Sequence, residues 1–369
     1  MTNVCVICGS KDTVDIMISK IGCILTDGKT QSTGLNKTHC LYCGILFNNT
    51  PPTITRYFRS DGNSKFDIER HATVANGISA IINRLFLSNF SKINVLEIGG
   101  GNFLTSLNLS RISNNWDVTC LEPFPETQDI PTEITCTISS LERYSADTAY
   151  DFIYSNQVIE HIPDLKRFIL KIEEMLKPNG VALFCCPTQT QITTETLFAD
   201  HIYHFSPQSF EILTANLQIS LIEEFVAPWD IYTHCYLVSK AEKKCTITNP
   251  LNPYSLLQKR QSLAKEWGHL DATLQEKISD YAGPIYLFGA GEYSQIVSFF
   301  APEFFKKINC IVATTKIGAR RFEKELTFLH NISVDSGFVF LSVRNEIQAD
   351  IKNMLKMTGW SEKYIFSIP

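Results

Sequence analysis

The glycine-rich turn at residues 99–101 constrains the fold of this chain more than any other feature. It follows a strand-like run, Val95 to Ile98, in which Glu97 is the one polar residue, and a second strand-like run ends about twenty residues later at Glu122. A strand that stops at such a turn lets the backbone approach a ligand, because glycine has no Cβ. The two runs therefore predict the first two strands of a Rossmann-like nucleotide-binding sheet.

The residues around the turn indicate which ligand binds there. Gly99 and Gly101 supply the close approach, and an acid at the position of Glu122 can accept both ribose hydroxyls. A dinucleotide site also requires a third glycine near the pyrophosphate, where this chain has Asn102 and Phe103. S-adenosylmethionine carries no phosphate, and Glu97 can face its cationic amino end. We therefore expect S-adenosylmethionine, although the same run could also be a plain strand-to-helix turn.

Composition excludes several classes of protein. A chain of 369 residues with 44% hydrophobic content is long enough for two or three domains, and a net charge of −5 offers no basic surface for nucleic acid. The first residues lack a signal-peptide pattern and no apolar run reaches membrane-spanning length, so we expect no membrane partner and a cytoplasmic location. Several cysteines outside the N-terminal pairs lie in apolar runs and are expected to be reduced core thiols: Cys120, Cys136, Cys185 and Cys186.

The pattern along the chain predicts three parts. Residues 1–70 are too few to form a large core and need a stabilising cross-link such as a bound metal. Residues 71–240 alternate between helix and strand. Residues 250–369 contain a further unit of strand, glycine turn and helix, which begins at 285–291. Within the middle part the alternation predicts a mostly parallel sheet, closed by an antiparallel hairpin. The expected strands are 93–98, 118–121, 150–154, 181–185, 221–225 and 232–238. The expected helices are 76–88, one after Asn102, 164–176 and one starting at 207.

Two CxxC pairs lie in the N-terminal part. Cys5 and Cys8 form one pair and Cys40 and Cys43 the other, and a glycine follows each pair. Four thiolates arranged tetrahedrally make a closed structural zinc site, which supplies folding energy to a small segment. A filled site of this kind has no open position for catalysis, so the zinc is expected to be structural.

Candidate catalytic residues follow two of the core strands. The strand expected at 150–154 continues into a polar loop with Asn156, Glu160 and His161, at the sheet edge where ligands of open α/β sheets bind. After the next strand, Asp200 precedes His201, and an acid can orient an imidazole and make it a better base. His201 is therefore the candidate base, whereas Glu160 and His161 could equally cap the following helix.

These motifs carry a resemblance to known enzymes. The "EHIPD" segment at 160–164 and the "LKPNG" segment at 176–180 resemble class I S-adenosylmethionine-dependent methyltransferases. With the cysteine pairs and the C-terminal glycine turn, the whole arrangement resembles the zinc-containing sugar C-methyltransferases that act on nucleotide-linked keto-deoxysugars. The resemblance implies an α/β fold with a Rossmann-like methyltransferase core, an N-terminal four-cysteine zinc module and a C-terminal Rossmann-like α/β domain.

The resemblance also implies roles for particular residues. Glu97, Gly99, Gly101 and Glu122 would bind S-adenosylmethionine, with Asn156 beside it, and His161 and His201 would act in the chemistry. The family segment "EHxxYF" reads "DHIYHF" here, so Asp200 replaces the glutamate.

The expected reaction is therefore C-methylation of a nucleotide-linked sugar through a histidine-assisted enolate. Two alternatives remain open. One is O-methylation of a sugar or another small metabolite, and the other is a binding scaffold in which Phe103 blocks the cofactor turn.

Overall fold

The computed structural model describes residues 3–52, 65–86, 92–127, 129–215, 217, 219–240, 247, 250–314, 322, 324–334 and 336–369. The chain divides into two compact units. Unit 1 contains residues 1–17 and 35–261, and unit 2 contains residues 18–34 and 262–369. This division differs from the three consecutive parts expected from the sequence, because residues 18–34 group with the C-terminal third.

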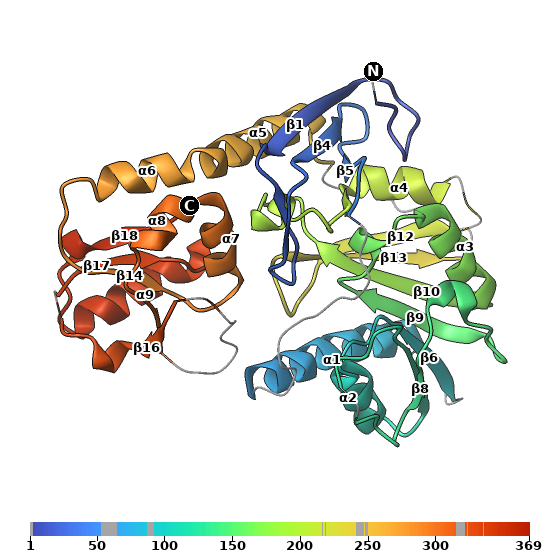
Figure 1. The fold of residues 1–369 in the computed structure, drawn as a ribbon. Coiled ribbons are helices and arrows are strands. Elements are labelled where there is room, and N and C mark those ends of the chain that lie inside the picture. The colour runs from blue at the N-terminus through green and yellow to red at the C-terminus, as the bar shows by residue number, and fades with distance from the viewer. Residues whose placement is uncertain are drawn as a thin grey trace. The chain divides into compact units, whose positions relative to one another are not determined.

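A seven-stranded sheet forms the centre of unit 1 (Figure 1). Strands β10, β9, β6, β7 and β8 are parallel, and the hairpin of β12 and β13 closes the sheet in antiparallel fashion against β10. Five of the six predicted core strands lie within one of these elements, the sixth begins one residue before β13, and the predicted closing hairpin is confirmed. In sheet order the strands are β12 (Ser220–Val226), β13 (Thr233–Ser239), β10 (Leu176–Pro187), β9 (Tyr150–Asn156), β6 (Ile93–Ile98), β7 (Trp116–Leu121) and β8 (Thr135–Thr137).

Helices cover both faces of this sheet. Helices α1 (Lys65–Phe86) and α2 (Leu104–Ile112) bury residues such as Ile78 and Leu109 against one face. Helices α3 (Leu165–Met175) and α4 (Pro207–Ala215) bury Phe168, Ile172 and Phe210 against the other. The strands are therefore apolar on both sides, as a doubly wound sheet requires.

The N-terminal segment packs on the same unit. Strand β11 (Tyr203–His204), from the core, completes a four-stranded sheet with three N-terminal strands, β1 (Thr13–Ser19), β4 (Leu35–Cys40) and β5 (Leu46–Asn48). Phe47 joins the same buried cluster as Phe205 and Phe210. The N-terminal module thus shares a hydrophobic core with the α3 and α4 face of the large sheet.

Unit 2 is a second α/β structure. Its main sheet is five-stranded and parallel, in the order β16 (Leu326–Phe328), β15 (Cys310–Ala313), β14 (Ile285–Phe288), β17 (Phe338–Leu341) and β18 (Ile365–Ser367). Its helices are α6 (Leu270–Lys277), α7 (Glu292–Phe300), α8 (Pro302–Lys307) and α9 (Asn345–Met357), and a small hairpin joins β2 (Cys23–Ile24) to β3 (Thr30–Gln31). Helix α5 (Pro253–Gly268) contains the boundary between the units. The predicted α/β class, with a Rossmann-like core and a second Rossmann-like domain, is confirmed.

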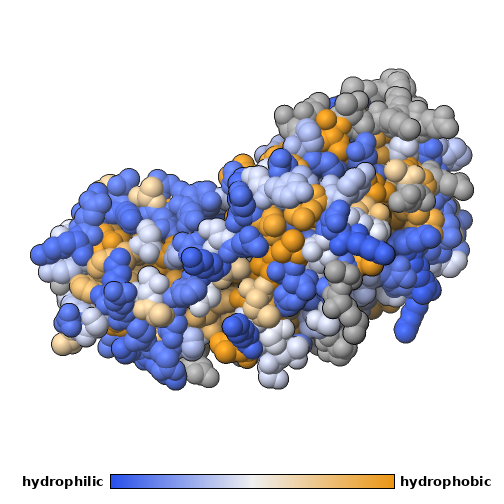
Figure 2. Space-filling model, turned by 90° about the horizontal axis from the view of Figure 1, so that it is seen from above, coloured by the Kyte–Doolittle hydropathy of each residue, from blue (hydrophilic) through white to orange (hydrophobic). Residues whose placement is uncertain are grey.

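The surface carries polar residues over most of the face seen in Figure 2, with separate apolar patches between them. Among the described residues, no helix combines the length and the apolar character needed to cross a lipid bilayer.

Candidate cofactor and catalytic site

The glycine turn lies at the carboxyl end of β6, as predicted. Gly99 has φ +81° and Gly101 φ +55°, backbone conformations that favour glycine. A Cβ on Gly99 would also overlap the side chain of Val158, so the turn packs directly on the loop that follows β9. The Gly99 amide donates to the carbonyl of Leu121 at 2.8 Å, which ties the turn to the end of β7.

Glu122 closes the other side of the turn. Its carboxylate accepts hydrogen bonds from the amides of Gly101 at 2.9 Å and Phe124 at 2.7 Å. The side chain is buried, and it stands at the end of β7, one strand away from the turn. The acid therefore lies where the sequence analysis expected it, fixed by two backbone donors.

Glu97 lies beneath the turn. It is buried, and its carboxylate accepts a hydrogen bond from the hydroxyl of Ser106 on α2. Burial raises the pKa of Glu97 to about 6, although the hydrogen bond from Ser106 favours the ionised form. This carboxylate therefore links the end of β6 to α2 from inside the protein.

The raised pKa of Glu97 predicts a dependence of stability on pH. The folded state binds this proton more tightly than the unfolded state, whose ordinary value is 4.5, so stability is lost as pH rises from 4.5 through about 6. The loss corresponds to about 2 kcal/mol. Between pH 4.5 and pH 8, Glu97→Gln should lose less unfolding free energy than the wild type, by about that amount. Urea unfolding of both proteins at the two pH values measures this change. An equal change in unfolding free energy for the variant and the wild type would contradict the expectation.

The end of β9 offers unsatisfied polar atoms next to the turn. In the parallel pairing, Ile98 of β6 stands opposite Ser155, and Cys185 of β10 stands opposite Asn156. Within the described parts of the chain, the Ser155 hydroxyl and Oδ1 of Asn156 are buried and have no hydrogen-bond partner. Buried polar atoms of this kind fit a ligand that supplies donors and acceptors.

Phe103 does not obstruct the turn. It adopts a left-handed backbone conformation with φ 65° just before α2, and its side chain is fully buried in the cluster formed by α1, α2 and the sheet. Its ring therefore points into the core, and the proposal of a blocked scaffold loses its only support in the sequence.

Two histidines meet near the carboxyl ends of β9 and β10. His161 ends the short helix η2 (Ile159–His161), and His201 follows the helix η3 (Thr194–Leu197) and Phe198. Both are buried, and their rings meet edge to face with centroids 4.6 Å apart. Together with Glu160 they offer three potential ligand or base atoms within 4.8 Å of one another.

The acids around these histidines are distributed differently from the sequence expectation. Glu195 Oε2 lies 3.3 Å from Nδ1 of His201, whereas the Asp200 carboxylate lies 3.9 Å from Nδ1 of His161. Nδ1 of His161 also lies 2.8 Å from the Asp200 carbonyl, and since a carbonyl only accepts, this nitrogen carries the proton. The expectation that Asp200 orients His201 is therefore revised: the structure places Glu195 against His201 and Asp200 against His161.

His204 has a structural environment. It is buried, and its Nε2 lies 2.8 Å from the ammonium of Lys37. Burial and the positive charges of Lys37 and Arg260 hold the pKa of His204 well below its usual range. A neutral imidazole that accepts from a lysine is poorly suited to take a substrate proton.

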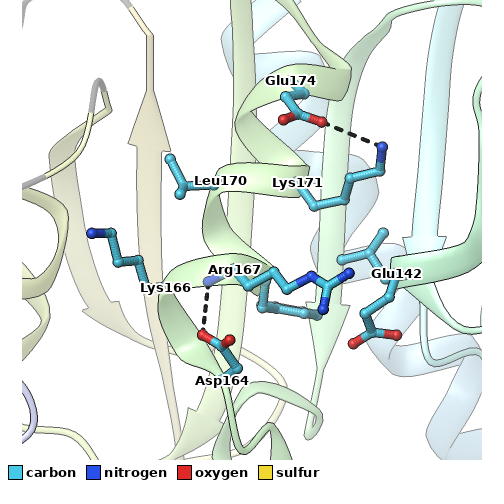
Figure 3. A pocket seen from close by; sticks show the side chains of 9 residues that line it. Glu142, Asp164, Lys166, Arg167, Leu170, Lys171 and Glu174 are labelled. Carbon is cyan, nitrogen blue, oxygen red and sulfur yellow. Dashed lines mark hydrogen bonds and ion pairs between the residues drawn. The ribbon is translucent and has the colours of Figure 1, made fainter.

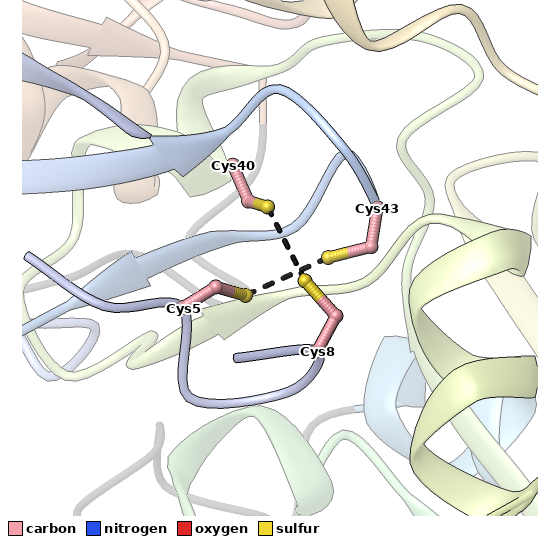
Figure 4. Close-up of side chains that lie close together, drawn as sticks. All are labelled: Cys5, Cys8, Cys40 and Cys43. Atoms are coloured by element: carbon pink, nitrogen blue, oxygen red, sulfur yellow. Dashed lines mark hydrogen bonds between the residues drawn. The ribbon is translucent and has the colours of Figure 1, made fainter. Parts of the chain in front are cut away.

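The four cysteines come together in the N-terminal module (Figure 4). The sulfur atoms of Cys5 and Cys43 are 3.6 Å apart, as are those of Cys8 and Cys40. A tetrahedron with metal–sulfur bonds of about 2.3 Å has edges of about 3.8 Å, whereas a disulfide would need about 2.05 Å. The donor set and its spacing therefore fit a zinc ion.

The two CxxC pairs have matching backbone geometry. Gly9 donates to the carbonyl of Cys5 at 2.9 Å, and Gly44 donates to that of Cys40 at 3.0 Å. Such paired turns are typical of two metal-binding knuckles.

A surface pocket of about 420 Å³ lies at the start of α3 (Figure 3). Both acidic and basic side chains line it, and Asp164 caps the helix by accepting from the amide of Arg167. None of the candidate cofactor, catalytic or metal residues lines this pocket.

Comparison with protein families identifies the central part of the chain. Residues 69–241 match the family model described as a methyltransferase domain. The ubiquinone biosynthesis O-methyltransferase of Rickettsia akari (strain Hartford) is 26% identical over 153 residues, which are 39% of this chain and 60% of that protein. Its counterpart in Rickettsia typhi (strain ATCC VR-144 / Wilmington) is 24% identical over 158 residues, 40% of this chain and 63% of that protein. The chain thus spans less than two thirds of the length of these curated relatives.

The solved structures that this chain matches include two methyltransferases. The plantazolicin methyltransferase BpumL in complex with SAH has a TM-score of 0.39 at 11% identity, over 48% of this chain and 87% of that one. The N-methyltransferase NodS from Bradyrhizobium japonicum WM9, in complex with S-adenosyl-l-homocysteine, has a TM-score of 0.34 at 17% identity, over 48% and 88%.

Proposed function

Residues 69–241 match a methyltransferase domain, and from this premise we propose that the protein catalyses S-adenosylmethionine-dependent methylation of a small molecule. The substrate we propose is a nucleotide-linked keto-deoxysugar, methylated on carbon. One observation supports a histidine base in this reaction: buried His201 lies 3.3 Å from the half-buried Glu195 carboxylate and meets His161 at the edge of the sheet where the glycine turn also lies.

Two glycines of the turn and three residues around it have proposed roles in cofactor binding. Gly99 and Gly101 let the backbone approach the ligand, and Glu122 accepts the ribose hydroxyls. Asn156 contacts the ligand from the neighbouring strand through its unsatisfied oxygen. Glu97 supports the turn from below through Ser106. S-adenosylmethionine, when bound, supplies an electrophilic methyl group on a sulfonium.

His201 is the proposed base. It takes the proton from the carbon next to the sugar ketone, and Glu195 holds the imidazole and complements the positive charge that it gains. The carbon–hydrogen electron pair becomes part of an enolate, whose oxygen carries the negative charge. In its protonated form His161 can donate to this oxygen, with the Asp200 carboxylate beside it. The four cysteines hold a structural zinc ion and take no part in these steps.

O-methylation is the second candidate function. The curated relatives quoted above are named O-methyltransferases. The same histidine can remove the proton of a hydroxyl, which then becomes the nucleophile. The geometry of the base does not distinguish the two reactions.

A labelling experiment distinguishes them. The purified protein is incubated with S-adenosylmethionine carrying a ¹³C methyl group and a panel of nucleotide-linked sugars, including 4-keto-6-deoxy forms. A new signal in the carbon-attached methyl region supports C-methylation, and one in the methoxy region supports O-methylation. Absence of any labelled product across the panel would reject the proposed substrate class, with boiled protein as the control.

The role of Glu122 makes a separate prediction about cofactor affinity. Glu122→Gln replaces a charged acceptor by a neutral one, so the Kd for S-adenosylhomocysteine should rise by about 10- to 100-fold. Isothermal titration calorimetry gives this value directly. Glu133→Gln is a matched control, because Glu133 is an exposed acid that pairs with Arg111 at 2.9 Å. Equal affinities for both variants would exclude Glu122 from the cofactor site.

A further inference from the structure

We propose that Lys37, in the N-terminal module, is a positioning residue that holds residues 198–204 and thereby fixes the direction of the His201 imidazole. The inference rests on the proposed role of His201 as the base. Lys37 belongs to β4, which ends at Cys40, and none of the sequence patterns assigned it a function.

The segment that carries His201 is bound to the N-terminal module along its length. Tyr203 and His204 pair with Phe47 and Leu46 of β5. The amide of Asn48 donates to the carbonyl of Ile202 at 2.8 Å, and its side chain donates to the carbonyl of Ala199 at 3.0 Å. The backbone on both sides of His201 therefore depends on strands that lie more than 150 residues earlier.

Lys37 adds a charged contact at three points of this segment. Its ammonium donates to the carbonyl of Phe198 at 2.6 Å, to the carbonyl of His201 at 3.0 Å and to Nε2 of His204 at 2.8 Å. An ammonium has three hydrogens, and these three acceptors match that number. The contacts bracket His201 and include its own carbonyl, so they restrain the residue whose ring meets Glu195 and His161.

The chemistry of this contact argues for a role beyond packing. Lys37 is fully buried, and a buried ammonium is costly unless its hydrogen bonds are good. An apolar side chain at position 37 could pack against residues 198–204 at a lower cost in desolvation free energy. It could not, however, donate hydrogen bonds to the carbonyls of Phe198 and His201. Because a misplacement of about 1 Å can cost about 10²-fold in rate, a restraint on the backbone of a base has functional value.

The restraint also connects the cysteine cluster to the proposed base. Lys37 and Cys40 lie on the same strand, and the hydroxyl of Ser206, two residues after His204, donates to the carbonyl of Cys43 at 2.6 Å. The four-cysteine cluster and residues 198–206 are thus both attached to β4 and to the turn that follows it.

Three variants of the full-length protein test the proposal. Lys37→Met removes the charge at similar length, Lys37→Arg retains donors, and Lys11→Met makes the same change at an exposed lysine of the same module. Hydrogen exchange followed by mass spectrometry reports on residues 198–206, and ¹⁵N signals of labelled histidines report on the ring of His201. Calorimetry gives the Kd for S-adenosylhomocysteine, and the best substrate of the labelling panel gives kcat and KM.

For Lys37→Met we expect exchange at 198–206 to rise at least about 10-fold, with residues 93–103 unchanged and the His201 signals shifted. The kcat should fall about 10²-fold, while the Kd for S-adenosylhomocysteine stays within about twofold. Lys37→Arg should recover part of kcat, and Lys11→Met should match the wild type. Unchanged exchange and unchanged His201 signals would overturn the proposal, and so would a rise spread evenly over the whole chain. If the wild type methylates nothing, the proposed function fails, whereas exchange and spectra still decide the role of Lys37.

Discussion

Replacing Cys43 with serine is expected to remove the bound metal and to unfold the N-terminal module. Binding of structural zinc by four thiolates is worth about 10–16 kcal/mol in isolated peptides, and a hydroxyl is a poor ligand. The zinc content, measured by mass spectrometry, should fall from about one ion per chain to almost none. The melting temperature of unit 1 should fall by more than about 10 °C, because each kcal/mol lost shifts a domain of this size by about 2–4 °C.

The control for this prediction is Cys136→Ser. Cys136 lies in β8, half-buried and outside the cysteine cluster, so this variant should keep its zinc. A wild-type protein without zinc, or a Cys43→Ser protein that retains it, would contradict the assignment.

The loss should extend beyond the cysteine cluster. Cys5, Cys40 and Cys43 belong to the same buried cluster as Phe205 and Phe210, which pack on the large sheet. Without the metal, nothing holds the four cysteines together. The neighbouring core residues then lose the side chains that pack over them. We therefore expect the methyltransferase core to lose cooperativity when the metal leaves.

Replacing His201 with alanine is expected to reduce kcat by about 10²- to 10⁴-fold, the range found when a general base is removed. The Kd for S-adenosylhomocysteine should change by less than about twofold, because His201 lies in a different loop from the turn and Glu122. Initial rates with the best substrate of the labelling panel, together with calorimetry, give both values. Activity that survives this change would remove His201 from the mechanism.

Companion variants separate the two acids. Glu195→Gln should lower kcat more than Asp200→Asn, because Glu195 is the acid within 3.3 Å of the His201 ring. The reverse order would restore the pairing expected from the sequence. His269→Ala, at an exposed histidine of unit 2, should leave the rate unchanged.

The sequence predicted those parts of the fold that local patterns determine. Strand β6 begins and ends where it was expected, at Ile93 and Ile98, because an apolar run bounded by turn residues is a local signal. Helix α1 begins at Lys65, about three turns before the predicted start, where the charged residues hide the helical period. Residues 87 and 88 of that predicted helix lie outside the described part of the chain.

The catalytic site was less predictable, because the path of the loops determines which side chains contact the two histidines His201 and His204. Glu195 and Lys37 meet His201 and His204 only through the path of residues 188–206, which no short-range pattern encodes. The direction of Glu97 was equally hidden, since β6 is covered on both faces and strict alternation does not apply to it. By contrast, the cysteine cluster followed from spacing alone, because a metal imposes the same geometry in many folds.

The hairpin at residues 18–34 affects the order in which the chain can fold during synthesis. It belongs to unit 2, and within that unit Gly28 lies against Gln295 of α7. A ribosome makes this hairpin early and most of its unit only after residue 261, so the hairpin must wait for the last third of the polypeptide, whereas unit 1 can be completed before then. A recombinant fragment that starts at residue 262 would therefore lack part of its own domain, and both units are best studied in the intact chain.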